Sequence, residues 1–177
     1  AGFDPSERPL ALLPGSFHPL HDGHRGMARV AQRLLDCRVV WELSIANVDK
    51  PPLDYLAIAD RTSQFGPDAY LLTRAPTFVA KGRLLPGVTF VVGADTIERV
   101  GETRYYEQER ALRDAAIDEL AALGCRFLVF GRQVGGEFQT LEELDLPPRL
   151  RELCLGVAAE EFRHDISSTS LRAHWTN

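Results

Sequence analysis

Short apolar runs alternate along this chain with longer segments in which apolar residues recur at helical spacing. The first run, from Leu10 to Leu13, is followed by Pro14 and Gly15, and such a bounded run is typical of a buried strand. Similar runs predict further strands at residues 38–43, 70–73, 88–92, 126–130 and 154–157.

Helical periodicity is clearest after His24, which we therefore expect to open an amphipathic helix. The apolar positions of that helix are Met27, Val30, Ala31, Leu34 and Leu35. Other patterns predict a helix near 57–65, one that begins at Gly93-Ala94-Asp95, and a long one over 107–123 that Gly124 ends. Consecutive prolines predict a loop over 49–53.

Strands that alternate with helices imply right-handed crossovers and a mostly parallel sheet. We therefore predict an α/β fold, a Rossmann-like doubly wound sheet of about five parallel strands with flanking helices. The length of 177 residues predicts a single domain over residues 1–177. Ligands of such folds bind at the carboxyl ends of the strands, where we place Gly15, Gly93 and Gly131.

Composition narrows the choice of partners. A net charge of −5 without a lysine or arginine block gives no electrostatic footprint for duplex nucleic acid, although a nucleotide needs only one small basic pocket. No apolar run approaches the ~20 residues that cross a bilayer, so we expect no membrane partner. Cys37, Cys125 and Cys154 fit neither a disulfide framework nor a CxxC metal site, which predicts a cytoplasmic protein. Because the chain begins at Ala1, we hypothesise that it was processed or excised from a longer fusion protein.

Three of the five histidines, His18, His21 and His24, fall within seven residues directly after the first predicted strand. A helix N-terminus presents unpaired N–H groups and attracts anions, and histidines there add directed donors. Gly15 and Gly23 lack a Cβ and allow close approach of a ligand oxygen. This segment therefore predicts a phosphate-binding site.

Two other interpretations of this cluster stay open. The spacing of three between His18, His21 and His24 is compatible with a zinc site, although Pro19 and Gly23 oppose the continuous helix that would align the ligands. The three residues can also be ordinary loop histidines, because short motifs match by chance.

A second candidate anion site lies near the other end of the chain. Hydroxyl residues open a short predicted helix there, and Arg172 follows about one helical turn later; the hydroxyls are Ser167, Ser168 and Thr169. A guanidinium at that distance can grip the same phosphate in a bidentate manner. The alternative is a capped helix with a solvated arginine.

The two motifs together, GSFxPxHxGH over residues 15–24 and ISSTxxR over 166–172, resemble those of the HxGH nucleotidyltransferase superfamily. The nicotinamide and nicotinate mononucleotide adenylyltransferases are especially similar, and the resemblance covers nearly the whole chain. Gly93-Ala94-Asp95 also resembles the segment that these enzymes place beside the nucleotide. Glu42-Leu43-Ser44 and the 49–53 loop resemble a less characterised branch that is sometimes fused to an amidase-like domain.

The resemblance implies that a phosphate oxygen of an acceptor attacks the α-phosphorus of a nucleoside triphosphate and expels pyrophosphate. It assigns catalytic contacts to His21, His24 and Arg172, and a phosphate contact to Ser16 and the backbone of Phe17. Ser167, Ser168 and Thr169 would grip the β- and γ-phosphates beside Arg172. Mg2+ would arrive as the nucleotide complex.

Other implied roles are less well defined. His18 stands where relatives carry Asp or Asn, and is either a third phosphate donor or a loop residue. Gly93 and Asp95 would lie beside the nucleotide. The acceptor-binding candidates are Lys50 on the proline loop, Tyr105 in place of a stacking tryptophan, and Arg132 at a strand end.

We therefore expect an adenylyltransferase that uses ATP and a phosphorylated acceptor such as nicotinamide or nicotinate mononucleotide. One alternative is a cytidylyltransferase that uses CTP and a phosphorylated alcohol. Another is a nucleotide-binding regulatory domain with little transfer activity. A homo-oligomer and a fusion to another domain are both compatible with the sequence.

Overall fold

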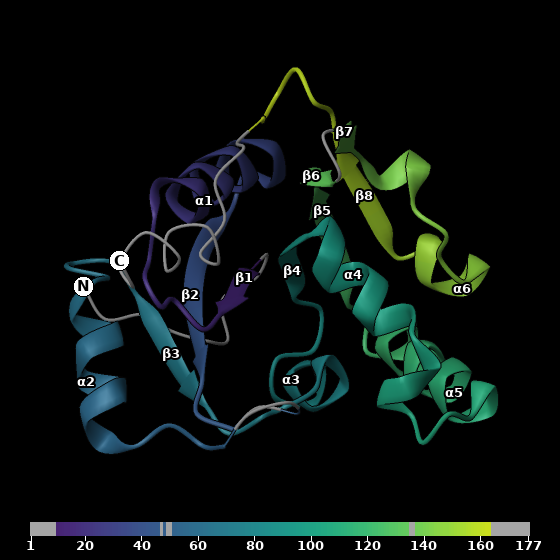
Figure 1. The fold of residues 1–177 in the computed structure, drawn as a ribbon, viewed down its shortest axis with the longest axis horizontal. Coiled ribbons are helices and arrows are strands. Elements are labelled where there is room, and N and C mark those ends of the chain that lie inside the picture. The colour runs from purple at the N-terminus through teal and green to yellow at the C-terminus, as the bar shows by residue number, and fades with distance from the viewer. Residues whose placement is uncertain (1–9, 47, 49–50, 135–136, 164–177) are drawn as a thin grey trace.

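The computed structural model describes residues 10–46, 48, 51–134 and 137–163. Six strands form one parallel sheet in the order β3-β2-β1-β4-β5-β8 (Figure 1). The prediction of a Rossmann-like α/β fold is confirmed, with one strand more than the approximate five. Each predicted strand is present, with bounds at Leu10–Gly15 (β1), Arg38–Ser44 (β2), Tyr70–Thr73 (β3), Thr89–Gly93 (β4), Arg126–Phe130 (β5) and Cys154–Val157 (β8).

Helices connect these strands, and none of the described ones is both long and apolar enough to cross a membrane. The structure also contains elements that the sequence did not predict: two 3-10 turns, η1 (Thr103–Tyr105) and η2 (Leu141–Glu143), and an antiparallel hairpin of β6 (Arg132–Val134) and β7 (Glu137–Gln139). The helices are α1 (Asp22–Leu35), α2 (Tyr55–Ser63), α3 (Phe78–Leu84), α4 (Ala94–Gly101), α5 (Arg110–Ala122) and α6 (Pro148–Arg151).

Two predicted helix starts are wrong. The first helix begins at Asp22 with His21 as its N-cap, so His24 lies inside the first turn. The predicted helix over 107–123 begins only at Arg110, because Glu107 and Gln108 have φ values of 54° and 64°, which a right-handed helix does not accept. The short α3 and α6 were not predicted at all.

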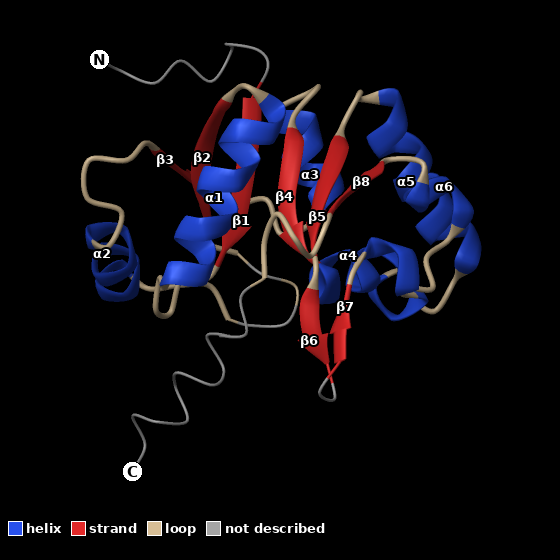
Figure 2. Ribbon diagram, turned by 90° about the horizontal axis from the view of Figure 1, so that it is seen from above, coloured by secondary structure: helices blue, strands red, loops and turns tan. Residues whose placement is uncertain are grey.

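Side chains of the strands point alternately to two faces, and each face has its own apolar cluster. Leu10 and Leu12 of β1 pack in one cluster, whereas Ala11 and Leu13 pack in the other. Helix α1 covers the face of Leu13, and α3, α4 and α5 cover the opposite face (Figure 2). The central strands β2, β1, β4 and β5 are thus buried on both sides, which explains why they read as continuous apolar runs.

A buried ion pair interrupts the apolar interior next to the carboxyl end of β2. Glu42 is fully buried, and its Oε2 lies 3.2 Å from the Nζ of Lys81 on α3. Lys81 also donates to the carbonyl of Ala75 at 2.7 Å, and the hydroxyls of Ser44 and Thr73 donate to Glu42 Oε1. Burial lowers the pKa of Lys81, and the Glu42 charge opposes that shift. The pair joins β2, β3 and α3.

Substitution of Lys81 by Met should lower the free energy of unfolding by about 3–5 kcal/mol, because it leaves a buried carboxylate without its partner. The double variant Glu42→Gln/Lys81→Met should be more stable than Lys81→Met, since an amide keeps the hydroxyl contacts without a charge. Urea denaturation at pH 7 compares the proteins. Equal stability of wild type and Lys81→Met would contradict the role assigned to the pair.

Candidate functional site

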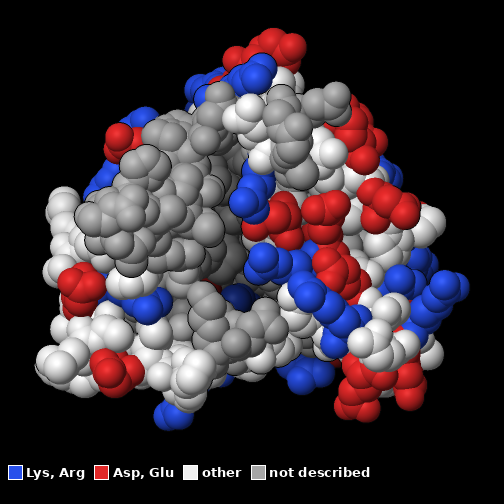
Figure 3. Space-filling view, viewed as in Figure 1, with Lys and Arg blue, Asp and Glu red and all other residues white. Residues whose placement is uncertain are grey.

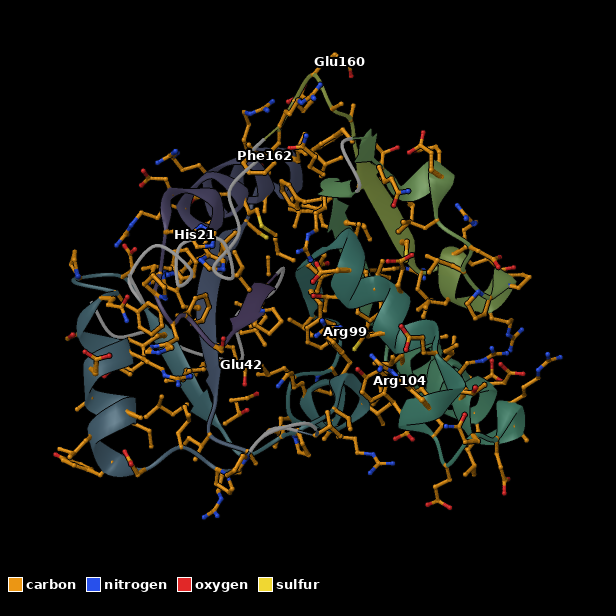
Figure 4. The ribbon with its side chains drawn as sticks, in the orientation of Figure 1. His21, Glu42, Arg99, Arg104, Glu160 and Phe162 are labelled. Carbon is orange, nitrogen blue, oxygen red and sulfur yellow. The ribbon has the colours of Figure 1, made fainter. Side chains whose placement is uncertain are left out.

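The candidate site lies where β1 ends and α1 begins. The strand order reverses between β1 and β4, whose connections leave toward opposite faces of the sheet. In a doubly wound sheet this switch point opens a crevice at the carboxyl edge, and ligands bind there. On the side of α4 and α5, Lys and Arg side chains lie among Asp and Glu side chains on the surface that Figure 3 shows. His21 lies on the α1 side of the face, and Arg99 of α4 lies across from it (Figure 4).

The loop between β1 and α1 is organised around Phe17. This residue has a φ of 43°, and its ring is only 1% exposed. The ring packs edge-on against His24, Trp41 and Phe65, with centroid separations of 5.3, 5.5 and 5.1 Å. The side chain of Phe17 therefore fixes the loop in the core, in addition to the backbone role that the resemblance implies.

Gly15 is required because of the same ring. A Cβ on Gly15 would lie 2.7 Å from two ring atoms of Phe17, closer than any real contact. Gly15→Ala should therefore destabilise the protein by about 1–3 kcal/mol through overpacking. A Phe17→Leu background should reduce that cost, which a double-mutant cycle by thermal denaturation measures. An unchanged cost in that background would exclude the proposed clash.

His21 and His24 form a paired cap at the start of α1. The His21 backbone N–H donates to Nδ1 of His24 at 3.3 Å, and the two rings stack with a centroid separation of 3.8 Å. An imidazole whose Nδ1 accepts a hydrogen bond carries its proton on Nε2 when neutral. His24 is therefore an N–H donor at a helix N-terminus, as an anion site requires.

The electrostatic environment keeps His24 neutral in the free protein. Burial, and to a smaller extent the neighbouring charge of His21, together lower the pKa of His24 to about 3. The unfolded chain has a histidine pKa of about 6.5, so it binds more protons than the folded chain between these two values. Folding stability is therefore lost as the pH falls below about 6.5.

This linkage predicts that the free energy of unfolding depends more strongly on pH in the wild type than in His24→Asn, because the asparagine amide does not titrate. From pH 7 to pH 5 the wild type should lose about 2 kcal/mol more of its unfolding free energy than the variant, since His24 alone contributes that amount. Urea denaturation of both proteins at each pH tests this. Parallel pH profiles would show that His24 is not held neutral.

Two further predicted residues meet at the ends of β4 and β5. Asp95 in the first turn of α4 pairs with Arg132, at 2.6 Å between Oδ2 and Nη1. Gly93 is the N-cap of α4, and a Cβ on it would lie 3.0 Å from Asp95 Oδ1. The side chains of Asp95 and Arg132 are more than a third exposed, so water weakens the pair and a ligand can compete for either partner.

The structure places other predicted residues apart or leaves them undescribed. Tyr105 lies in η1, separated from Gly93 by the whole of α4, with the Arg104 guanidinium 4.6 Å from its ring centroid. Ser16 is half-buried, His18 is exposed, and Gly23 is buried in α1. The predictions for Lys50, Ser167, Ser168, Thr169 and Arg172 fall outside the described residues.

The last described segment approaches the start of α1. Phe162 packs against Gly26, where a Cβ would lie 2.6 Å from its ring, and against the ring of Phe130 at 5.1 Å. The segment from Ala158 to Arg163 thus crosses from β8 to α1. Sequence reasoning missed Phe162, because a single aromatic residue after the last strand carries no pattern.

Sequence reasoning also missed two side chains at the end of α2, Arg61 of the last turn and the C-cap Gln64, which contact the loop between β1 and α1. Arg61 donates to the Ser16 carbonyl at 2.9 Å, and Gln64 donates to the Phe17 carbonyl at 3.1 Å. No local signal distinguishes them from other polar residues of a half-exposed helix. As for metals, the described part of the chain contains no group of three or more His, Cys, Asp or Glu that could hold an ion.

A comparison with protein families shows which family this chain resembles. The model of a family described as cytidylyltransferase-like matches residues 12–174, which include nearly all of the described structure. The match begins within β1, so it contains the whole loop and both capping histidines.

Proposed function

The chain belongs to the cytidylyltransferase-like family, and from that premise we propose that it transfers a nucleoside monophosphate from ATP to a phosphorylated acceptor, releasing pyrophosphate. The acceptor that we propose is nicotinamide or nicotinate mononucleotide. The observation that carries the proposal is the His21–His24 pair at the start of α1, where Nε2 of a neutral His24 is available as a donor.

In this reaction a phosphate oxygen of the acceptor attacks the α-phosphorus, and the bond from that phosphorus to the bridging oxygen of pyrophosphate breaks. The protein forms no covalent bond, so its contribution is alignment of two anions and stabilisation of charge on their oxygens. His24 Nε2–H, the neighbouring His21 and the N-terminus of α1 supply donors to the triphosphate. Mg2+ enters as part of the substrate, held by phosphate oxygens, which are the hard ligands that it prefers.

Ser167, Ser168, Thr169 and Arg172 are proposed to bind the β- and γ-phosphates from the other side. The described chain supports this, because Phe162 packs on Gly26, one turn beyond the capping histidines.

The acceptor is proposed to bind toward α4. We propose that Arg132, which pairs with Asp95 at the ends of β4 and β5, binds the phosphate of the acceptor. We also propose that Lys50 contacts the phosphate of the acceptor and that Tyr105 stacks on the ring of its base. The second candidate function is a cytidylyltransferase that uses CTP and a phosphorylated alcohol, which the family description favours.

His24→Ala should lower turnover by about a hundredfold or more, because the loss of one charge-stabilising donor costs on the order of 3 kcal/mol of barrier. Pyrophosphate release is followed with Mg2+, with ATP and CTP in turn, and with a panel of phosphorylated acceptors. The exposed Arg29 on the same helix supplies the control, since Arg29→Ala should keep the wild-type rate.

The outcomes of this assay separate the candidates. Release with CTP alone would replace the adenylyltransferase proposal with the cytidylyltransferase. Nucleotide binding without release for any acceptor would identify a regulatory domain. Near-normal turnover of a folded His24→Ala variant would show that the motif has been assigned wrongly.

A further inference from the structure

Helix α2 is joined to residues 16–21, the loop between β1 and α1 that we call the phosphate loop, by side-chain hydrogen bonds from Arg61 in its last turn and from its C-cap, Gln64. Arg61 Nη1 donates to the Ser16 carbonyl at 2.9 Å. The Gln64 amide makes two contacts, since its Nε2 donates to the Phe17 carbonyl at 3.1 Å and its Oε1 accepts from the Leu20 N–H at 2.8 Å. The loop is therefore held at three successive points by residues more than forty positions away in sequence.

These contacts determine where the neighbouring N–H groups point. In a planar trans peptide the C=O and the N–H project in opposite directions. Arg61 and Gln64 draw the carbonyls of Ser16 and Phe17 toward α2, so the N–H groups of Phe17 and His18 must face away from it. In the part of the chain that the structure describes, the Phe17 N–H donates no hydrogen bond.

Consecutive N–H groups around a left-handed residue form a concave anion site. Phe17, with its φ of 43°, provides that conformation. If either carbonyl turned toward the crevice, its oxygen would repel a phosphate instead of binding it. The direction of these two peptides therefore decides whether the loop attracts or rejects an anion.

We infer that Arg61 and Gln64 are positioning residues, which turn the peptides of the phosphate loop so that their N–H groups bind the triphosphate. This inference rests on the proposed function. Neither residue touches the reacting atoms. They act through the backbone of Ser16 and Phe17.

Two additional contacts indicate that the end of α2 and the loop form one unit. Phe65, directly after Gln64, packs edge-on against the Phe17 ring at 5.1 Å. Arg25 of α1 donates to the Gln64 carbonyl at 2.9 Å.

The test compares Arg61→Met, Arg61→Lys and Gln64→Met with wild type and with Arg29→Met as the control for a lost charge. Calorimetry measures the binding of MgATP and of inorganic tripolyphosphate, and hydrogen–deuterium exchange reports on a peptide that covers residues 14–21. Both Met variants should bind MgATP and tripolyphosphate about tenfold more weakly, because a misdirected peptide loses one hydrogen bond from its N–H to a charged phosphate oxygen. The loop should also exchange faster. Arg61→Lys keeps a charged donor and should recover part of the affinity.

The results judge the inference separately from the function. Wild-type affinity in Arg61→Met and Gln64→Met would overturn the inference while leaving the proposed function intact. If Gln64→Met does not fold, the two Arg61 variants decide alone, since Arg61 is only half-buried and is not one of the residues whose rings pack against Phe17. A wild-type protein that binds neither MgATP nor tripolyphosphate would overturn the proposed function. The exchange rates of residues 14–21 in the variants would then show by themselves whether Arg61 and Gln64 hold the loop.

Discussion

The packing of Phe17 into the core is the interaction on which the site depends. A non-glycine residue with positive φ carries backbone strain of about 1–3 kcal/mol, and it persists only when its surroundings compensate. Contacts with His24, Trp41 and Phe65 provide that compensation, and Gly15 leaves the space for the ring. Contacts within the protein thus fix the conformation of the loop, and for the phosphate binding that we propose this would provide electrostatic preorganisation.

The order of the strands gives the site its two halves. Because β1 and β4 are neighbours whose helices cover opposite faces, α1 and α4 both begin at the same carboxyl edge. One helix start presents the stacked rings of His21 and the neutral His24, and the other presents the ion pair Asp95–Arg132. A nucleotidyltransferase must bind two anionic substrates side by side, and two separate helix N-termini supply attraction for both without a large positive field.

Local sequence patterns predicted the strands and the histidine motif. They did not predict the elements and side chains whose positions depend on contacts with residues far away in sequence. The four central strands are buried on both faces and read as apolar runs, and the edge strands β3 and β8 were found because they too are short apolar runs, although Leu72 and Leu155 are exposed. Helix α3 was missed because Lys81, Gly82 and Arg83 break its apolar pattern, and its position depends on the ion pair with Glu42 across the fold. Arg61 and Gln64 were missed for the same reason, since their partners lie 45 and 47 positions away.

A neutral His24 agrees better with catalysis than a charged one would. A permanent cation would bind the ground-state triphosphate and the pyrophosphate product nearly as strongly as the transition state, and uniform binding of this kind does not raise kcat. An imidazole with a pKa of about 3 donates a hydrogen bond from Nε2 without a full charge. As negative charge grows on the phosphate oxygens, that hydrogen bond strengthens and the pKa of His24 rises. In the reaction that we propose, this stabilisation would therefore be largest in the transition state and would accelerate the transfer.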